Sequence, residues 1–119
     1  AGRRKMNTLL RGRAGEAQAA EYLRRHGWDV LAAGYRCRFG EIDLIARKRS
    51  TVAFVEVKLR RNDDFASACA AVTPQKQERL RKTAACWLAE DGGEWNCRFD
   101  VIEIYTETGR LNHIEDAFQ

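Results

Sequence analysis

The chain has 119 residues, of which 45% are hydrophobic and 32% are charged, and its formal net charge is +4. This length is typical of one domain, so we expect residues 1–119 to fold as a single unit. No apolar run approaches the ~20 residues that span a membrane. No apolar segment follows the basic residues at the start, as a signal peptide would require. We therefore expect a cytoplasmic protein without a membrane partner.

The charge is unevenly distributed along the chain. Residues 1–61 contain 15 Lys and Arg against 6 Asp and Glu, a balance of +9, whereas residues 62–119 contain 6 against 11, a balance of −5. A cationic surface suits a polyanionic partner, because phosphate contacts supply most of the nonspecific affinity for nucleic acid. The alternative is a solvated charged surface with no specific partner.

The cysteines and histidines show no metal-ligand spacing. The four cysteines form no C-x-x-C pair, and the two histidines are isolated from each other. A zinc site is therefore not expected. In a reducing compartment such cysteines are free and mostly buried.

The N-terminal part of the chain predicts a basic tail followed by a helix. Residues 1–8 show no apolar periodicity, and we expect them to form a flexible basic tail. From about Thr8 or Gly12 to His26 the chain is rich in good helix formers. Gly27 is a natural stop for this helix.

Glu16 is the unusual residue of the predicted helix, because helical spacing places it on the apolar stripe. That stripe also contains Ala19, Ala20 and Leu23. A carboxylate on a buried face needs a partner, which a basic residue or a metal-bound water can supply. The alternative is an acid at the rim of the stripe, favoured near the start of a helix by the helix dipole.

Three strands in a meander are expected after the helix. Residues 28–38 predict the first strand, irregular around Gly34, and residues 41–46 predict the second. Residues 47–50 are expected to form a basic hairpin tip, after which the third strand runs to Lys58.

The rest of the chain predicts one helix and two strands. The helix starts with a threonine N-cap and a proline, Thr73 and Pro74, and continues to about Glu90. Residues 98–105 predict a fourth strand, and residues 111–114 predict a short edge strand. This order of elements predicts an α/β sandwich with a mixed central sheet flanked by helices.

The stretch from Gly40 to Lys58 carries the candidate chemistry. Period-2 alternation in the third strand places Glu56 and Lys58 on one face, about 7 Å apart at two residues' rise. Asp43 lies inside the preceding strand between two hydrophobic residues, where an unpaired charge would be costly. The sequence therefore predicts two acids and a lysine on one patch of the sheet.

This combination is what metal-dependent phosphodiester hydrolysis requires. Mg²⁺ takes oxygen ligands, which Asp43 and Glu56 can supply. Lys58 can orient the attacking water or stabilise charge on the phosphate. The alternative is a structural ion pair with Lys58, although such a pair needs no second acid beside it. Asp100 is left out of the predicted site, because Arg98 can pair it.

The order of several motifs resembles the YraN-like family, small bacterial proteins described as candidate endonucleases. The motifs are Gly12-x-x-Gly15-Glu16, Tyr22-Leu23, Gly40-Glu41-Ile42-Asp43-Leu44-Ile45, Phe54-Val55-Glu56-Val57-Lys58, Lys76-Gln77 and Arg98-Phe99-Asp100-Val101. The central motifs also resemble the PD-(D/E)XK nuclease pattern, although no proline precedes Asp43. The resemblance extends from about Arg11 onward. It implies the PD-(D/E)XK restriction-endonuclease-like fold, similar in outline to Holliday junction resolvases.

The resemblance also implies catalytic and metal-binding residues. Asp43, Glu56 and the backbone carbonyl of Val57 would hold Mg²⁺, with Mn²⁺ as an alternative. Glu16 would support the site from the first helix, and Gln77 would orient a phosphate or a water. The products would carry a 5′-phosphate.

Four basic residues are candidates for nucleic-acid binding. Arg36 and Arg38 alternate along the first strand and can contact backbone phosphate at the edge of the site. Arg60 falls on the face of the catalytic lysine by alternation. Lys76 is included through the family motif, with an ordinary polar first turn of a helix as the alternative. Residues 65–72 are weakly patterned, and we expect them to form a loop over the site.

The predicted function is nucleic-acid binding with Mg²⁺-dependent endodeoxyribonuclease activity of the PD-(D/E)XK type, on branched or otherwise structured DNA. The first alternative is a non-catalytic nucleic-acid-binding accessory protein of recombination or repair. The second is a structural adaptor whose acids form internal ion pairs. Since the related resolvases act as two-fold dimers, a homodimer is an open alternative to a monomer, although the chain shows no dimer motif.

Overall fold

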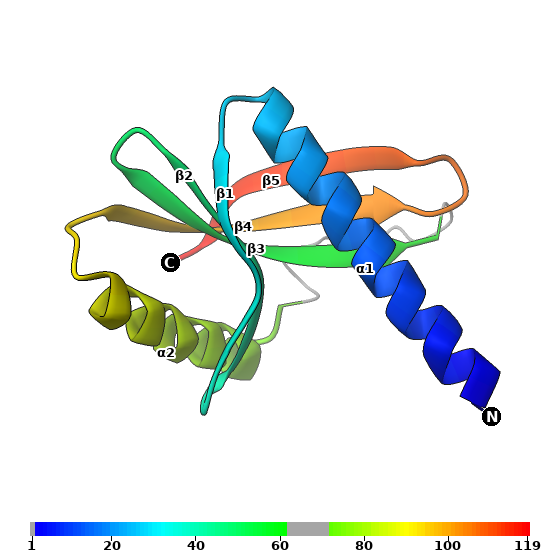
Figure 1. Ribbon diagram of the computed structural model, residues 1–119, viewed down its shortest axis with the longest axis horizontal. Helices are drawn as coiled ribbons and strands as arrows, with labels where there is room; N and C mark the ends of the chain where they lie inside the picture. Colours follow the sequence, from blue (N-terminus) through cyan, green and yellow to red (C-terminus); the bar gives the residue numbers. More distant parts are fainter. Residues whose placement is uncertain (1, 62–71) are drawn as a thin grey trace.

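Two helices and five strands make up the part of the chain that the computed structural model describes, residues 2–61 and 72–119, with side chains from Arg13 onward (Figure 1). In chain order the elements are α1 (Gly2–Arg25), β1 (Asp29–Cys37), β2 (Gly40–Lys48), β3 (Thr51–Arg60), α2 (Pro74–Asp91), β4 (Asn96–Tyr105) and β5 (Arg110–Phe118). Within these ranges neither helix combines the length and the apolar character needed to cross a membrane.

The strands form one mixed sheet in the order β1-β2-β3-β4-β5. Neighbouring strands are antiparallel except β3 and β4, which run parallel from Thr51↔Asn96 to Arg60↔Tyr105. A parallel pair needs a crossover connection, and α2 lies in that connection. The predicted α/β arrangement with a mixed central sheet is therefore confirmed.

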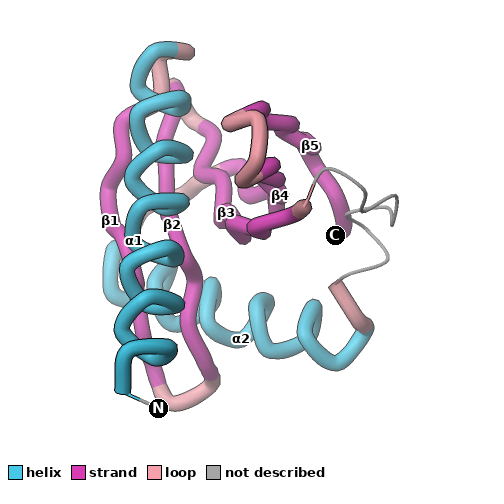
Figure 2. The backbone as a smooth tube through the Cα atoms, turned by 90° about the vertical axis from the view of Figure 1, so that its right-hand side faces the viewer, coloured by secondary structure: helices cyan, strands magenta, loops and turns pink. Residues whose placement is uncertain are grey.

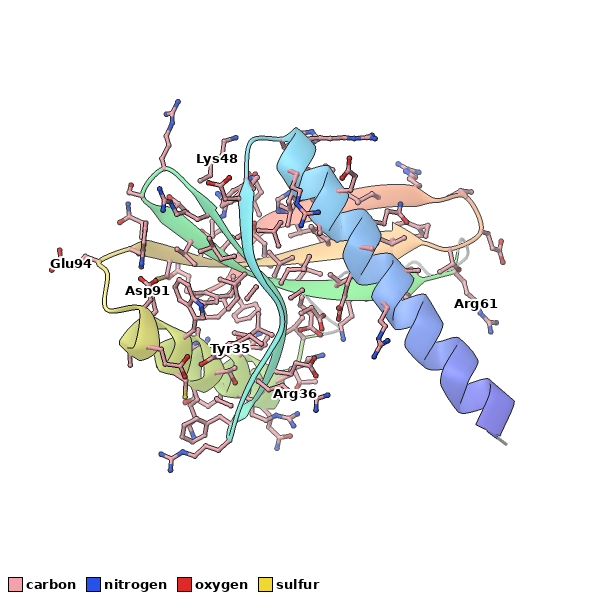
Figure 3. All side chains as sticks on the ribbon, in the orientation of Figure 1. Tyr35, Arg36, Lys48, Arg61, Asp91 and Glu94 are labelled. Atoms are coloured by element: carbon pink, nitrogen blue, oxygen red, sulfur yellow. The ribbon has the colours of Figure 1, made fainter. Side chains whose placement is uncertain are left out.

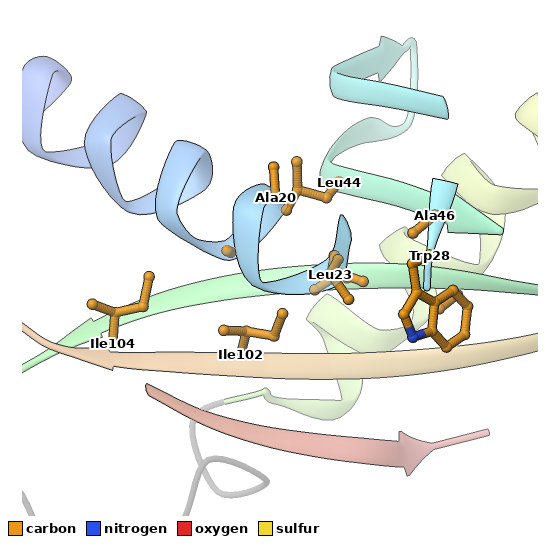
Figure 4. Close-up of a cluster of buried hydrophobic side chains, with 10 residues drawn as sticks. Ala20, Leu23, Trp28, Leu44, Ala46, Ile102 and Ile104 are labelled. Carbon is orange, nitrogen blue, oxygen red and sulfur yellow. The ribbon is translucent and has the colours of Figure 1, made fainter. Parts of the chain in front are cut away.

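The two helices pack on opposite faces of the sheet (Figure 2). α1 places Ala20 and Leu23 of its predicted apolar stripe against Ile102 of β4 and its neighbours (Figure 4). Val55 of β3 belongs to the same cluster. α2 places Leu80 and Ala84 against a cluster that includes Phe54. Because successive strand residues point to opposite faces, the sheet is the middle of three layers.

α1 begins earlier than predicted, at Gly2 rather than at Thr8 or Gly12. Residues 2–8, expected to belong to a flexible basic tail, continue the helix instead. Their arginines, lysine and methionine are good helix formers, which accounts for the earlier start. The predicted stop is confirmed, because Gly27 follows the helix with a left-handed φ of 86°.

α2 begins as predicted. The side-chain oxygen of Thr73 accepts a hydrogen bond from the Lys76 amide at 3.2 Å, and Pro74 is the first helical residue. The helix ends at Asp91, close to the predicted end. Of the loop expected at residues 65–72, all but the last residue lie outside the described residues.

The last two strands are longer than predicted. β4 begins at Asn96, before the expected start at residue 98. β5 runs to Phe118 instead of covering only residues 111–114. The ring of Phe118 stacks on Phe99 of β4 with centroids 4.8 Å apart. This contact extends the strand pairing into a segment that shows no strand pattern of its own.

β2 and β3 are joined by the predicted basic hairpin tip but separate along their length. Their ladder starts at Lys48↔Thr51 and ends at Leu44↔Val55. Beyond that point β2 pairs only with β1, and β3 pairs only with β4. Figure 1 shows the β1–β2 hairpin turning away from the rest of the sheet toward α2.

The hairpin bends at Asp43. Ile42 packs on the α2 side and Leu44 on the α1 side, although residues two apart in a regular strand share a face. The register places Gly34 of β1 opposite Asp43, and Gly34 has a φ of 67°. This confirms the irregularity predicted around Gly34. The bend opens the sheet beside the candidate acid.

Candidate functional site

Three carboxylates meet where α1 lies over the divergence of β2 and β3. Glu16 comes from α1, and Glu41 and Asp43 come from β2. One oxygen of each carboxylate lies within 4.8 Å of the others, and we call these three residues the acidic cluster. Among the described residues, no other group of three Asp, Glu, His or Cys side chains is close enough to share a metal ion.

Gly15 positions Glu16 by letting α1 approach β3. A Cβ atom at Gly15 would lie 2.8 Å from the Cδ2 atom of Leu59, so a larger residue would displace at least this leucine side chain. The glycine therefore lets α1 lie close to β3 with Leu59 in place. Because Glu16 follows directly, this approach brings its carboxylate to the acidic cluster.

The carboxylate of Asp43 accepts a β3 backbone hydrogen bond that β2 no longer accepts. Its Oδ2 atom accepts a hydrogen bond from the Val57 amide at 2.8 Å, in the part of β3 that β2 no longer pairs. Burial raises the pKa of Asp43 to about 7, the negative charge of Glu56 adds to the rise, and the Val57 amide opposes it. Burial, followed by the charge of Glu41, also raises the pKa of Glu16, which is hydrogen-bonded to Asp43. The acidic cluster thus concentrates negative charge, which neighbouring arginines neutralise only in part.

Glu56 lies beside two lysines, Lys58 and Lys76, which we call the lysine pair. Its Oε1 atom is 2.7 Å from the Nζ of Lys76 and 3.5 Å from the Nζ of Lys58. Burial lowers the pKa of Lys58, and the neighbouring Lys76 lowers it further. Burial opposes the charge of Lys76 as well, but its hydrogen bonds, first of all to Glu56, and the charges of Glu56 and Asp43 together outweigh burial and raise the pKa of Lys76. Lys58 is therefore the member of the pair that loses its proton more readily.

The predicted acids and the predicted catalytic lysine come together at this point of the sheet. Glu56 and Lys58 share a face, as alternation requires, and the charge of Glu56 acts on Asp43. The amide of Val57 contacts Asp43 directly. Since the N–H and C=O groups of one strand residue point to the same edge, the Val57 carbonyl faces the diverging β2 as well.

Gln77 and Lys76 have partners within the protein. The Gln77 side chain donates from Nε2 to the Val72 carbonyl at 3.0 Å and accepts at Oε1 from Arg81 at 3.3 Å. Orientation of a phosphate or a water by Gln77 stays a prediction. Lys76 lies in the ion-paired group around Glu56, and its predicted contact with nucleic acid stays a prediction.

The three arginines expected to contact phosphate differ in exposure. Arg36 is exposed on the β1–β2 hairpin (Figure 3) and lies 3.3 Å from Glu41 of the acidic cluster. Arg38 is also exposed, with its guanidinium 4.7 Å from the centroid of the Phe39 ring. Arg60 is only 14% exposed and pairs with Glu103 of β4 at 3.3 Å. The geometry thus gives Arg60 a partner within the sheet, and its phosphate contact stays a prediction.

Glu41 is the site residue that the sequence analysis missed. It lies two residues before Asp43, so strand alternation indicates a shared side of β2. However, Glu41 lies beside the turn at Gly40, where exposed acids without a function are common, so the sequence did not single it out. Only the bend of the hairpin at Gly34 brings Glu41 to Glu16, and a Cβ atom at Gly34 would lie 3.4 Å from the Glu41 Oε1 atom.

Asp100 is paired within the sheet, as the sequence analysis anticipated. Arg98 donates two hydrogen bonds to it at 3.0 Å, and the Asp116 amide donates another at 3.0 Å. His113, isolated in the sequence, has its Nε2 atom 2.7 Å from Asp100 and its Nδ1 atom 3.1 Å from the Tyr22 hydroxyl of α1. This network ties α1 to β4 and β5 and leaves Asp100 outside the acidic cluster.

The three cysteines that the structure describes are free thiols, but they are less buried than predicted. Cys37 and Cys86 are partly exposed, and Cys97 is exposed. Cys69 lies outside the described residues. Both partly exposed thiols are near the tip of the β1–β2 hairpin, where the sequence pattern alone indicates no contact.

Comparison with known proteins finds one matching family and many similar chains. The model of the family described as uncharacterised protein family UPF0102 matches residues 15–104. A UPF0102 protein of Nocardia farcinica is 44% identical over 111 residues, covering 90% of this chain and 87% of the relative. One of Syntrophus aciditrophicus is 43% identical over 119 residues, covering 98% and 94%. One of Nitrosomonas europaea is 46% identical over 105 residues, covering 88% and 87%.

Proposed function

The chain belongs to the uncharacterised protein family UPF0102, which confirms its sequence-based recognition as YraN-like, and we propose that it is a metal-dependent endonuclease acting on DNA. The observation that carries the proposal is the position of the acidic cluster next to the lysine pair, at the divergence of β2 and β3. We propose likewise that its α/β sandwich is of the PD-(D/E)XK nuclease type.

The donor atoms of the acidic cluster fit Mg²⁺ or Mn²⁺, which prefer oxygen ligands. Ligands on opposite sides of one Mg²⁺ lie about 4.2 Å apart, so an arrangement within 4.8 Å needs only small side-chain movements. The raised pKa of Asp43, which burial and neighbouring acids cause, marks negative charge that a cation would neutralise. The fit therefore rests on both the chemistry and the spacing of the donors.

Asp43 is the ligand common to both candidate sets. The set predicted from the sequence adds Glu56 and the Val57 carbonyl, and the acidic cluster adds Glu16 and Glu41. We propose that Asp43 would hold the metal together with donors from both sets, those of β3 and those of the acidic cluster. The lysine pair contacts the Oε1 atom of Glu56, so Oε2 is the oxygen proposed for the metal.

Residues near the proposed metal site would each have a separate role in the reaction. A bound divalent cation polarises the phosphodiester and lowers the pKa of a coordinated water. The Val57 amide holds the Asp43 carboxylate in a fixed orientation. The Nζ atom of Lys58, whose pKa is lowered by burial, orients the attacking water and can accept its proton. Lys76 supplies a positive charge to the phosphate oxygens.

The substrate proposed is branched or otherwise structured DNA. The hairpin that carries Glu41 also carries Arg36 and Arg38 on its exposed surface. A phosphate bound by Arg36 would lie next to the acidic cluster, because Arg36 already contacts Glu41. Such contacts position a DNA strand without reading its sequence. The proposal therefore predicts preference for DNA shape over sequence.

A non-catalytic nucleic-acid-binding protein is the second candidate. The observation that favours it is the ion pairing of Glu56, which is shared between both lysines. A carboxylate neutralised in this way is a weaker metal ligand. This candidate would keep the basic surface for DNA and leave the acidic cluster without a catalytic role.

Cleavage assays separate these candidates. We would incubate the protein with single-stranded, duplex, flapped and four-way junction DNA, in Mg²⁺, in Mn²⁺ and in chelator. Metal-dependent cleavage lost in Asp43→Asn, and retained in a matched Glu94→Gln variant of an exposed acid, would support the nuclease. Tight binding to one DNA structure without cleavage in either metal would support the second candidate. Absence of salt-dependent DNA binding would support a structural adaptor instead.

A further inference from the structure

Cys37 and Cys86 form a thiol pair outside the acidic cluster and the lysine pair. Cys37 is the last residue of β1, and Cys86 lies in α2. A hydrogen bond joins the two side chains, and both thiols are free and partly exposed. The two cysteines lie 49 positions apart in sequence, so their contact depends on how the hairpin rests on α2.

Two contacts hold the tip of the β1–β2 hairpin against this part of α2. A Cβ atom at Gly40 would lie 3.4 Å from the Thr83 Oγ1 atom, so the backbone of the tip is close to the helix. The Tyr35 hydroxyl donates a hydrogen bond to Glu90 at 2.9 Å. Thr83 precedes Cys86 by one helical turn and Glu90 follows it by one. The contacts therefore lie on both sides of the thiol pair along the helix.

The sulfur of Cys37 is surrounded by hydrogen-bond donors. The Phe39 amide donates to it at 3.4 Å, and the Cys86 thiol and the Gly40 amide donate as well. The Thr83 hydroxyl is also close to this sulfur, but it donates its proton to the Arg79 carbonyl at 2.8 Å. Burial alone would raise the pKa of Cys37, but these hydrogen bonds outweigh burial and lower it.

The two thiols are therefore unequal. The hydrogen bond to Cys37, followed by burial, raises the pKa of Cys86. The thiolate is the reactive form of cysteine, and donors around a sulfur favour that form. Cys37 is thus suited to act as the nucleophile and Cys86 as the thiol that resolves its oxidised product.

We propose that Cys37 and Cys86 form a peroxide-reactive dithiol that closes to a disulfide between the β1–β2 hairpin and α2. The Cys37 thiolate attacks one oxygen of hydrogen peroxide and breaks the O–O bond. The products are a sulfenic acid on Cys37 and hydroxide, which takes up a proton to become water. The Cys86 sulfur then attacks the Cys37 sulfur, and the sulfenic oxygen leaves as water with the Cys86 proton. The two electrons that the dithiol loses are those that the peroxide gains.

Closure of the disulfide requires the two sulfurs to move into bonding distance. The thiols are already in hydrogen-bond contact, whereas bonded sulfurs are about 2.05 Å apart. Rotation of the side chains, with adjustment of the partly exposed hairpin tip, can supply the remaining approach. The disulfide would then replace a weak hydrogen bond by a covalent link.

The link would lie beside a groove between the hairpin tip and α2. The groove has a volume of about 280 Å³ and is lined by Gly40, Glu41, Lys76, Arg79, Leu80 and Thr83. Glu41 and Lys76 belong to the acidic cluster and the lysine pair, so oxidation would restrict movement at one wall of the candidate site. An effect on cleavage would rest on the proposed function, whereas formation of the disulfide would not.

Disulfide mapping of the full chain tests the proposal. We would reduce the protein, remove the reductant, add hydrogen peroxide, block remaining thiols by alkylation, and digest without reduction for mass spectrometry. The expected product is a peptide pair linked through Cys37 and Cys86, with loss of two of the four free thiols. Cys97→Ser is the matched control, and it should form the same linked pair.

Two variants make the outcome decisive. Cys86→Ser should leave Cys37 as a sulfenic acid that a dimedone probe labels, because no thiol remains to resolve it. Tyr35→Phe, checked for folding by circular dichroism, should slow disulfide formation several-fold, because it removes the hydrogen bond to Glu90 that holds the hairpin tip against α2. Oxidation that links Cys37 to another cysteine, or that spares Cys37 while Cys97 reacts, would overturn the proposal.

Discussion

Asp43 and Asp100 are both carboxylates set into hydrophobic strands of one sheet, but their surroundings have opposite effects on their charge. Hydrogen bonds from His113 and Arg98 outweigh burial and lower the pKa of Asp100. Burial and the neighbouring Glu56 raise the pKa of Asp43 to about 7. Asp100 is therefore stabilised as a carboxylate, whereas the surroundings of Asp43 disfavour its charged form.

The difference teaches how a structural acid can be distinguished from a candidate ligand. A buried carboxylate surrounded by cationic and amide donors has its charge balanced and ties elements together. A partly buried carboxylate facing other acids gains stability when a proton or a cation arrives. This contrast makes the neighbourhood of Asp43 the candidate functional site, whereas that of Asp100 is paired within the sheet.

The largest expected effect is on cleavage. Asp43→Ala and Glu56→Ala should each lower metal-dependent cleavage by at least ~10³-fold, because each removes a proposed metal ligand. DNA binding and folding should be retained, as measured by gel shift and circular dichroism. Glu94→Gln should cleave normally. Full metal-dependent cleavage by either alanine variant would remove that residue from the catalytic site.

The next largest effect is the loss of stability expected when Asp100 is replaced. Asp100→Asn removes the charge that pairs with Arg98 and leaves a buried network unbalanced. The free energy of unfolding should fall by about 3–5 kcal/mol, measured by urea denaturation. Glu94→Gln should change it by less than about 0.5 kcal/mol. A loss below about 1 kcal/mol in Asp100→Asn would show that the network is dispensable.

Replacing Asp43 should change the free energy of unfolding in the opposite direction. Its pKa is about 7 in the folded protein against an ordinary value of 3.8, so the folded state retains the proton to higher pH. The contribution of Asp43 to the free energy of unfolding therefore falls as pH rises from about 4 to about 7. In chelator at pH 8, Asp43→Asn should be more stable than the natural protein by up to roughly 4 kcal/mol. The difference should shrink toward pH 4, and a constant difference would contradict the assignment.

The smallest effect is on the affinity for a metal. A carboxyl group must lose its proton to bind a cation, so affinity for Mn²⁺ should rise roughly tenfold between pH 6 and pH 8 if Asp43 titrates near 7. Isothermal titration calorimetry on the natural protein and on Asp43→Asn would measure this. Asp100→Asn, studied below its unfolding temperature, should keep the pH dependence. A pH-independent affinity would separate Asp43 from the metal site.

Much of the candidate site could be predicted from local pattern. Alternation places Glu56 and Lys58 on one face because the strand repeat depends only on neighbouring residues. The start of α2 at Thr73 was predictable for the same reason, since a threonine followed by proline satisfies the first helical amides locally. Glu16 could be singled out as an acid on an apolar stripe before any partner for it was known.

Contacts between distant elements could not be predicted in this way. Lys76 pairs with Glu56 only because α2 packs on the face of β3 that carries Glu56. Arg60 pairs with Glu103 only because β3 and β4 run parallel in one particular register. The sequence pattern places Arg60 on a strand face but contains no information on which strand becomes its neighbour.

By itself, the sequence determined the mixed α/β order of elements, the family, and the pairing of Glu56 with Lys58 on one strand face, because each follows from residues close together along the chain. Only the tertiary structure decided that Glu41 joins Asp43 and Glu16, and that Cys37 meets Cys86. Both contacts depend on the bend of the β1–β2 hairpin and on the helix against which it comes to rest. A bend turns a small change in backbone angle into a large displacement of the hairpin tip, and packing against distant elements selects its direction.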